Sequence, residues 1–390
     1  MTAGPGLLAQ VRVAQLGAVG PGARAARILA DYGAEVVRVE PPTGRRSGGG
    51  HDVPFHAYSA GRDTRRIRID LADPSGRDVF VRLADRFDVV IASFRPGAAD
   101  RMGVGDAALR TRNPAIIYCS ISGYGTAGPY ASWAGHDIDY LAVSGLAANG
   151  QRRADGGPAV PGATLADGAG GGMQAALAVM AALVHRARTG EGIHLDCAAV
   201  DGTLWLMSVA LEEHLAMGTT TDLGATLLTG TYAWYDFYRA ADDRWLAVGA
   251  IEPRFYRNLC GELGLDHLAD RQHDRDQRSI RDEFAAVFST RSRDDWVARL
   301  GPADTCVAPV NTVAEAFDDP HVASRLPVVV AHHPDHGTFR QLGPLLAGAM
   351  PPPREIELPP SDHTDTEQLL TAAGVPSAEI AALRRDGAIE

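Results

Sequence analysis

The sequence predicts an α/β protein, with a doubly wound parallel sheet followed by a smaller α/β region. Three observations support this fold class. Strand and helix patterns alternate over the first 125 residues, as they do in β-α-β units. A second group of strand and helix patterns occupies 231–300. The chain has 390 residues, 45% of them hydrophobic, and is therefore long enough for two domains.

The first region is predicted element by element. VRVAQLG at 11–17 and EVVRVE at 35–40 are strand patterns, and they flank a glycine-led helical period at 20–34. Such a β-α-β unit builds a parallel sheet. The other elements expected here are strands at 65–71, 88–94 and 115–125 and a helix at 76–87.

The remainder contains fewer strands. TLADGAGGG at 164–172 is a glycine-rich lead into a long helix that ends near Arg188, and HLDCAAV follows at 194–200. The segment 231–251 predicts two strands joined by a turn at Asp242–Asp243. We also expect a proline-rich loop at 350–360 and helices at 200–218, 253–263, 278–289, 293–300 and from 365 onward.

Ligands of doubly wound sheets bind beyond the carboxyl ends of the strands. Arg38 lies near the carboxyl end of the second strand, and Arg95 and Arg101 follow the strand at 88–94. Guanidinium groups suit phosphates, so these arginines either bind a phosphorylated ligand or are solvated surface charges. The predicted strand ends are Gly17–Gly22, Arg38–Glu40, Ser93–Gly97 and Ser122–Gly125.

The composition excludes several classes of protein. All 37 basic residues are arginine, which rules out a lysine Schiff base and a lysine-dependent phosphate loop. The net charge is −11, although residues 1–101 hold 15 arginines against 11 acidic residues. This balance favours an anionic small ligand near the N-terminal third and disfavours nucleic-acid binding.

The four cysteines form no CxxC pair, so neither a zinc site nor a disulfide framework is indicated. MTAGPGLLAQ does not resemble a signal peptide, and the apolar stretch 173–184 is too short to span a bilayer. We therefore expect a cytoplasmic protein without membrane contact. HHPDH at 332–336 and HDVPFH at 51–56 are interpreted as exposed loops rather than metal sites. GAVGPG at 17–22 is not GxGxxG, which favours a tight turn over nicotinamide binding.

Three residues are candidates for acid–base chemistry. His136 lies beside Asp137 in AGHDIDY, Asp167 precedes AGGG, and Glu252 precedes Pro253. Carboxylates at such positions are usually helix caps. The glycines after Asp167 would nevertheless admit a substrate closely.

Taken together, the motifs resemble the family III CoA-transferase (CaiB/BaiF) group, and within it the α-methylacyl-CoA racemase branch. The pairing of GHD with GAIEP is the signature of that branch, whereas transferases of the group keep only the aspartate. The matching segments are VEPPTG (39–44), SFRPG (93–97), SGYGTAGPY (122–130), AGHDIDYLAVSG (134–145), LADGAGGGM (165–173), RTGEGIHLDCAAVDG (188–202), ADDRWLAVGAIEPRFY (241–256) and DHTDTEQLL (362–370).

The resemblance implies a fold and an assembly. A large Rossmann-like CoA-binding domain at 1–200 would be completed by 326–390, with a linker helix at 201–227 and a small domain at 228–325. Two such chains interlock as a homodimer, and the active site forms between the large domain of one subunit and the small domain of the other.

The resemblance also implies an activity in fatty acid or other lipid metabolism, the racemisation of 2-methylacyl-CoA thioesters through an enolate. His136 and Asp167 would serve opposite faces of Cα, and Glu252 would hold His136. Backbone N–H groups near Asp137 and Gly168–Gly172 would stabilise the enolate oxygen. No cofactor is needed besides the CoA of the substrate. The residues expected near CoA or the thioester are Arg38, Ser93, Phe94, Arg95, Arg101, Gly135, Asp137 and Tyr140.

Two segments depart from the racemase pattern. Ala163 stands four residues before Asp167, where racemases often carry asparagine, and GTYAWY at 230–235 replaces GGAPFY. The missing asparagine would remove a partner of Asp167, and the second change would reshape the acyl pocket. Two alternatives remain: a CoA transferase with Asp167 as the nucleophile, and a CoA-binding protein without catalysis.

Overall fold

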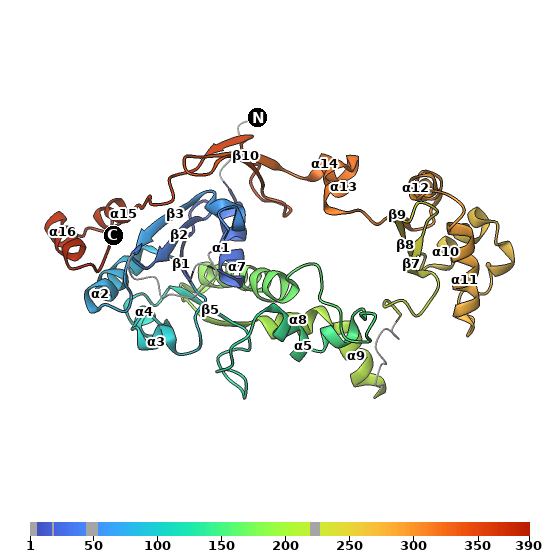
Figure 1. Cartoon of the computed structure of the whole chain (residues 1–390). Coiled ribbons are helices and arrows are strands. Elements are labelled where there is room, and N and C mark those ends of the chain that lie inside the picture. The colour runs from blue at the N-terminus through green and yellow to red at the C-terminus, as the bar shows by residue number, and fades with distance from the viewer. Residues whose placement is uncertain (1–5, 18, 44–53, 219–226) are drawn as a thin grey trace. The chain divides into compact units, whose positions relative to one another are not determined.

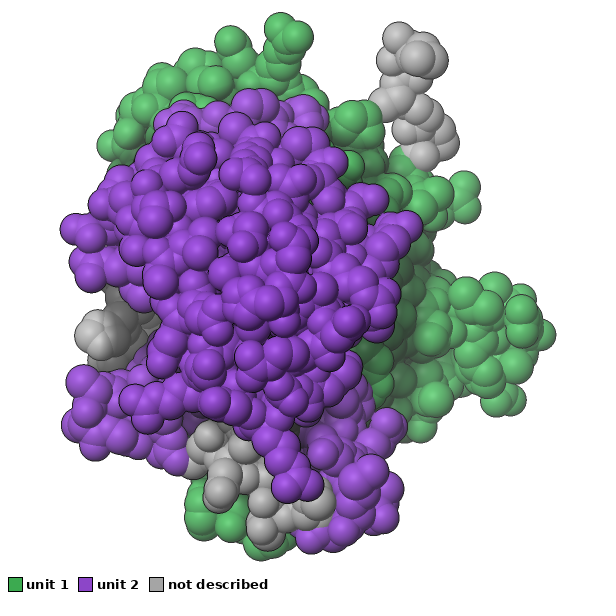
Figure 2. Space-filling model, turned by 90° about the vertical axis from the view of Figure 1, so that its right-hand side faces the viewer, with its two compact units in different colours: residues 1–144, 161–207, 325–390 green, residues 145–160, 208–324 purple. Residues whose placement is uncertain are grey.

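The computed structural model describes residues 6–17, 19–43, 54–218 and 227–390. The start of HDVPFH and the end of the expected linker helix lie outside these ranges. The chain divides into two compact units, coloured in Figure 2. The sequence-based division assigned 145–160 to the large domain, whereas the structure groups this segment with the second unit. Unit 1 comprises 1–144, 161–207 and 325–390, and unit 2 comprises 145–160 and 208–324.

Unit 1 is built on a six-stranded sheet in the order β3-β2-β1-β4-β5-β6 (Figure 1). Every neighbouring pair in it is parallel, which confirms the predicted parallel sheet. The strand order reverses between β1 and β4, and this reversal is the topological switch point of a doubly wound sheet. The strands are β1 (Arg12–Leu16), β2 (Glu35–Glu40), β3 (Thr64–Arg68), β4 (Val89–Ala92), β5 (Ile117–Ser122) and β6 (His194–Ala198).

Helices cover both faces of this sheet (Figure 1). On one face, α1 (Pro21–Asp31) and α7 (Gln174–Thr189) bury a core that includes Val13 and Val179. On the other face, α2 (Pro74–Leu83) packs with the C-terminal helices α15 (Thr366–Ala372) and α16 (Ser377–Arg385). Shorter helices of unit 1 are η2 (Ala57–Gly61), η3 (Ala84–Arg86), α3 (Ala98–Arg101), α4 (Asp106–Arg112), α5 (Asp137–Val143) and α8 (Ala199–Leu206).

The glycine-rich lead into α7 is itself helical and forms a π-helix, η4 (Ala166–Met173). It packs so closely on α8 that a Cβ added at Gly202 would lie 2.0 Å from the carbonyl oxygen of Gly170. π-helical turns are often found at functional sites. Together η4 and α7 form a 24-residue helix that is long and apolar enough to cross a membrane, and 39% of its most apolar window is buried inside the protein.

Unit 2 holds a three-stranded antiparallel sheet with helices packed on it. The turn at Asp243 has φ 63° and joins the two strands expected there. Trp234, Tyr256, Phe284 and Trp296 fill the core. The elements are α6 (Leu146–Asn149), α9 (Ser208–Met217), β7 (Tyr235–Arg239), β8 (Trp245–Gly249), α10 (Pro253–Leu263), η5 (Asp266–Leu268), α11 (Gln277–Phe288), α12 (Arg293–Leu300), η6 (Gly301–Ala303), β9 (Val307–Pro309), α13 (Val313–Asp318) and α14 (Pro320–Arg325).

Two local predictions were wrong. The helix expected at 200–218 breaks at Met207 into α8 and α9. Parts of the segments expected as an exposed loop (332–336) and a proline-rich loop (350–360) are strands, namely 332–333 and 355–357 of a small sheet in the order β11-β10-β12, whereas 334–336 form an exposed turn. Short strands between prolines gain their stability from pairing with β10, which a local pattern does not reveal. These strands are β10 (Val328–His333), β11 (Gly337–Leu342) and β12 (Glu355–Glu357).

Candidate active site

The carboxyl ends of β1 and β4 form the crevice in which a doubly wound sheet binds its ligand. The Ser93 N–H donates to the carbonyl oxygen of Leu16 over 3.0 Å, which joins the two strand ends. A Cβ on Gly22 would lie 2.7 Å from that of Ser93, so glycine lets α1 begin against β4. Gly20 has φ 73° directly before Pro21. The described part of GAVGPG is therefore the tight turn that its sequence predicts.

The residues expected near CoA differ in how exposed they are and in whether they already have partners in the protein. Arg95 and Arg101 are exposed beyond β4, whereas Phe94 packs against the core on the α2 face. Arg38 is half-buried and pairs with Glu40, with 3.4 Å between its Nη1 and the carboxylate Oε1. Burial lowers the pKa of the Arg38 guanidinium. Arg38 is thus already engaged by the protein, while Arg95 and Arg101 face solvent.

Asp167 is the second residue of η4 and is half-buried. Its backbone N–H donates to Oδ1 of Asp137 over 2.8 Å, which ties η4 to the start of α5. The η4 glycines hold it against α1, because a Cβ on Gly171 would lie 2.6 Å from Pro21. Asp167 therefore lies in the first turn of a helix packed on the N-terminus of α1, beside the switch point.

The surroundings of Asp167 favour a carboxylate that can accept a proton. Burial raises the pKa of Asp167, and the nearby charge of Asp137 raises it further. Arg24 and His136 act in the opposite direction and lower that pKa. The net effect is a raised pKa, which moves an aspartate toward the range useful for general acid–base work.

His136 is exposed and precedes the first residue of α5. Its backbone N–H donates to Oδ2 of Asp139 over 2.9 Å, which fixes the start of the helix. The next residue, Asp137, accepts the Asp167 N–H over 2.8 Å, so α5 and η4 are joined directly beside His136. The two residues that the sequence singled out for proton transfer thus lie on elements that contact each other.

A hydrogen bond and close packing join the Tyr140 side chain to the backbone at Gly135. The Tyr140 hydroxyl donates to the carbonyl oxygen of Gly135 over 2.5 Å, and the side chain is buried. Burial, followed by the charge of Asp167, raises the pKa of Tyr140 to about 12. Side chains at Gly123 or Gly135 would overlap the Tyr140 ring. This packing explains both glycines without a ligand.

Glu252 lies in unit 2, directly before α10, and is exposed. Its charge contributes, after burial, to a raised pKa of Cys306. Nearby, the departure GTYAWY has a structural role, since Trp234 is 1% exposed and its indole N–H donates to the carbonyl of Gln272 over 2.9 Å. Trp234 fills the core of unit 2, which explains part of the replacement of GGAPFY.

Two amides of the glycine-rich turn already have acceptors within the protein. The N–H of Gly168 donates to the carbonyl of Thr164 over 2.9 Å, and the N–H of Asp167 donates to Asp137. Gly168 is one of the residues expected to supply a donor to the enolate oxygen. For the rest of Gly168–Gly172 and for the amides near Asp137, that expectation stays a prediction.

Sequence reasoning missed Arg24 and Tyr58. Arg24 Nη2 donates to the Thr164 hydroxyl over 2.7 Å, and its guanidinium carbon lies 5.7 Å from the centre of the Tyr58 ring. The Tyr58 hydroxyl accepts from the N–H of Gly20 over 2.8 Å. A signal was available for Arg24, because it lies one turn beyond the predicted ligand edge at Gly17–Gly22. No sequence pattern indicates Tyr58, which reaches this turn from 38 residues away.

An aromatic cluster also borders this region. Tyr124 lies edge-on to Tyr140 with ring centres 5.1 Å apart, and Tyr130 stacks on Trp133 at 3.9 Å. Trp133 is 54% exposed. The cluster lies in the loops before α5 and offers an apolar surface near His136.

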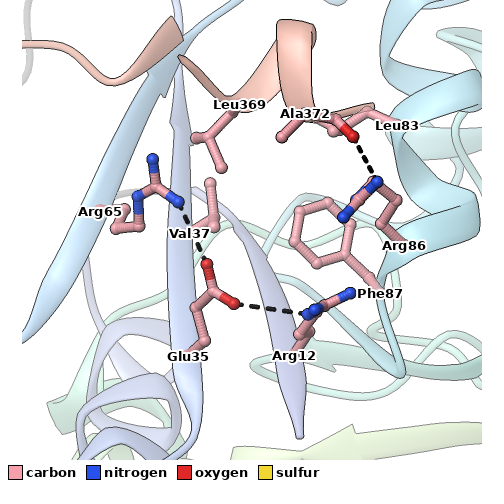
Figure 3. Close-up of a pocket in the computed structure, with 9 residues that line it drawn as sticks. All are labelled: Arg12, Glu35, Val37, Arg65, Leu83, Arg86, Phe87, Leu369 and Ala372. Atoms are coloured by element: carbon pink, nitrogen blue, oxygen red, sulfur yellow. Dashed lines mark hydrogen bonds and ion pairs between the residues drawn. The ribbon is translucent and has the colours of Figure 1, made fainter. Parts of the chain in front are cut away.

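A small cavity of about 180 Å³ lies at the opposite edge of the sheet, where β1 and β2 begin (Figure 3). The carboxylate of Glu35 bridges the guanidinium groups of Arg12 and Arg65 across it, and Arg86 donates to the carbonyl of Ala372. These arginines are engaged with protein groups, and the cavity is at the amino ends of the strands. It is therefore distinct from the switch-point edge.

Within the residues that the structure describes, no three side chains of His, Cys, Asp and Glu gather as metal ligands would. In HHPDH, His333 ends β10, and the ring of His332 contacts the Thr338 hydroxyl at 3.0 Å between Nδ1 and Oγ1. Strand pairing thus accounts for the placement of both histidines.

Comparison with known proteins identifies the class. The model of CoA-transferase family III matches residues 8–365. Alpha-methylacyl-CoA racemase of Homo sapiens is 35% identical over 382 residues, which cover 97% of each chain. Succinate–glutarate CoA-transferase of Agrobacterium fabrum is 30% identical over 82% of this chain and 83% of its own. The crystal structure of a CAIB/BAIF family protein from Brucella suis superposes with a TM-score of 0.73 at 27% identity, over 96% of this chain and 100% of its own.

The parallel sheet and these matches together define an α/β enzyme with the fold of this family. The chain belongs to CoA-transferase family III.

Proposed function

We propose that this enzyme is a racemase or epimerase of 2-methylacyl-CoA thioesters. The observation that carries the proposal is the hydrogen bond from the Asp167 N–H to the Asp137 carboxylate, which joins η4 to α5 directly beside His136. Inversion at Cα requires a base on one face and an acid on the other, and an imidazole and a carboxylate supply this pair. The similarity to proteins named alpha-methylacyl-CoA racemase supports the same reaction.

In the proposed mechanism, one group removes the Cα proton and the other returns a proton to the opposite face. Asp167 takes the proton from one epimer as a carboxylate, and its raised pKa strengthens it as a base. His136 takes the proton from the other epimer. Arg95 and Arg101 at the end of β4 bind the phosphates of CoA, with Ser93, Phe94 and Arg38 nearby. The reaction needs no metal and no cofactor other than the CoA of the substrate.

The second candidate is CoA transfer with Asp167 as a nucleophile. Ala163 favours it, because this residue stands where racemases carry asparagine and offers Asp167 no hydrogen bond. Several relatives at about 30% identity are named CoA-transferases. In that reaction Asp167 would attack the thioester, release CoA and form a mixed anhydride. His136 has no role in such a step, which is why racemisation is preferred.

Deuterium incorporation separates the two candidates. A single epimer of a 2-methylacyl-CoA is incubated with the enzyme in D2O, without an acceptor acid, and analysed by mass spectrometry and chiral separation. We expect one deuterium at Cα and loss of stereochemistry. Absence of uptake, followed by CoA exchange once a free carboxylate is added, would establish the transferase.

We further propose that two chains interlock as a homodimer, with Glu252 of the small domain reaching His136 of the partner's large domain. Apolar side chains exposed on η4 and α7 support a covered face, since Met173, Leu177 and Val184 are 48%, 66% and 53% exposed at helical spacing. We also propose that the enzyme is cytoplasmic and has no nucleic-acid or membrane partner.

Light scattering after size-exclusion chromatography tests the dimer. The expected mass is twice that of the 41.2-kDa chain. Leu177→Glu should reduce the dimer fraction, because it places a charge on the face that the partner covers. Leu7→Glu, which alters an equally accessible apolar residue at 75% exposure, is the matched control. A monomeric wild-type chain would contradict the proposal.

A further inference from the structure

We propose that Arg24 is a positioning residue that keeps Asp167 in its ionised, proton-accepting form and fixes the turn from which Asp167 projects. This inference rests on the proposed function, because it assigns Asp167 a role in proton transfer. It concerns a residue in the first turn of α1 that belongs to none of the motifs described above. The argument starts from how the side chain of Arg24 is held.

Arg24 is fixed along its length. Its Cβ packs on η4, where a Cβ added at Gly172 would lie 2.7 Å away. Its Nη2 donates to the hydroxyl of Thr164 over 2.7 Å, and Thr164 accepts the N–H of Gly168 over 2.9 Å. The Tyr58 ring lies against the guanidinium group. The charge is therefore held beside the turn that contains Asp167 rather than moving freely in solvent.

The hydrogen bonding of Arg24 is incomplete. Its Nε is buried and has no hydrogen-bond partner among the described residues. Arg27, Arg38 and Arg66 also bury a guanidinium nitrogen that makes no hydrogen bond within the described part of the chain, so the case for Arg24 rests on its position against η4.

The charges around Asp167 show why a cation matters there. From α5, Asp137 opposes ionisation of Asp167, while His136 favours it. Tyr140, also on α5, is buried and feels the charge of Asp167. Among the described groups that act on Asp167, Arg24 is the permanently charged cation.

An infrared titration tests the proposal without turnover. The carboxylic C=O band that is present in the wild type and absent from Asp167→Asn reports protonation of Asp167. In Arg24→Gln and Arg24→Met, we expect this band to titrate about one pH unit higher than in the wild type. Arg24→Lys retains the charge and should titrate close to the wild type. Arg188→Gln, at an exposed arginine near the end of α7, is the matched control.

The acidic limb of the pH profile for deuterium uptake should move by the same amount in the Gln and Met variants. Unchanged titration of Asp167 in a folded Arg24→Gln or Arg24→Met protein would overturn the inference. A shift that also occurs in Arg24→Lys would assign the effect to packing instead of charge and would overturn it too. A shifted titration in an enzyme that shows no deuterium uptake would retain the role of Arg24 and remove the racemase assignment.

Discussion

Asp167→Asn should lower the rate of inversion at Cα by about 10²–10⁴-fold, the usual contribution of a positioned acid or base. The amide has the size of the carboxylate but accepts no proton at neutral pH. The bond from the Asp167 N–H to Asp137 involves only the backbone at position 167, so the fold of η4 should survive the change. Chiral separation of the product after incubation in D2O measures inversion directly, and thermal unfolding monitors the fold.

The pH dependence follows from the same carboxylate. Burial and the charge of Asp137 raise its pKa above the usual aspartate value, so its protonated form persists to higher pH. Since the base must be ionised, inversion from the epimer that faces Asp167 should fall as the pH drops through this raised pKa. The acidic limb should therefore lie above the range expected for an exposed aspartate.

Asp201→Asn is the matched control for Asp167→Asn. Asp201 is an exposed carboxylate on α8, and burial and Asp196 raise its pKa as well. We expect it to leave inversion near the wild-type rate. Full inversion activity in the Asp167→Asn protein would contradict the assignment of Asp167 as the base, whereas absence of both inversion and CoA transfer in the wild type would favour a CoA-binding protein without catalysis.

The central sheet was predictable because each of its strands can be recognised from the residues of that segment alone. The strands at 11–17, 35–40 and 88–94 are rich in valine and other apolar residues and are bounded by turn residues, as expected for strands that helices cover on both faces. Their carboxyl ends could be marked in advance, which placed Ser93 at the ligand edge. The helices at 253–263 and 293–300 were also predicted at their observed bounds, from helical spacing and flanking caps.

The parts that sequence reasoning missed depend on contacts between distant segments. The glycines of η4 were expected to admit a substrate closely, but they also allow helices to meet at backbone distance, as the approach of Gly202 to Gly170 shows. The influence of Arg24 on Asp167 arises from the packing of α1 on η4, across about 140 residues. The bonds already made by the Asp167 and Gly168 amides were invisible for the same reason.

His136→Ala should lower the rate of deuterium exchange into one substrate epimer by about 10²–10⁴-fold and leave the rate for the other epimer largely unchanged. The reason is geometric, since a group on one face of Cα can abstract only the proton on that face. Asp167→Asn should produce the opposite preference between epimers. His185→Ala, at an exposed histidine of α7, is the matched control and should affect neither epimer.

Exchange should be measured on each pure epimer at early times, by mass spectrometry and chiral separation together. Exchange without inversion is the decisive signature, because the remaining base can remove a proton and return a deuteron to the same face while the opposite face lacks its acid. In the His136→Ala protein, the epimer that faces Asp167 should therefore gain deuterium and keep its configuration. Equal residual exchange from both epimers would mean that one group serves both faces, which contradicts the two-base mechanism while leaving the family assignment intact.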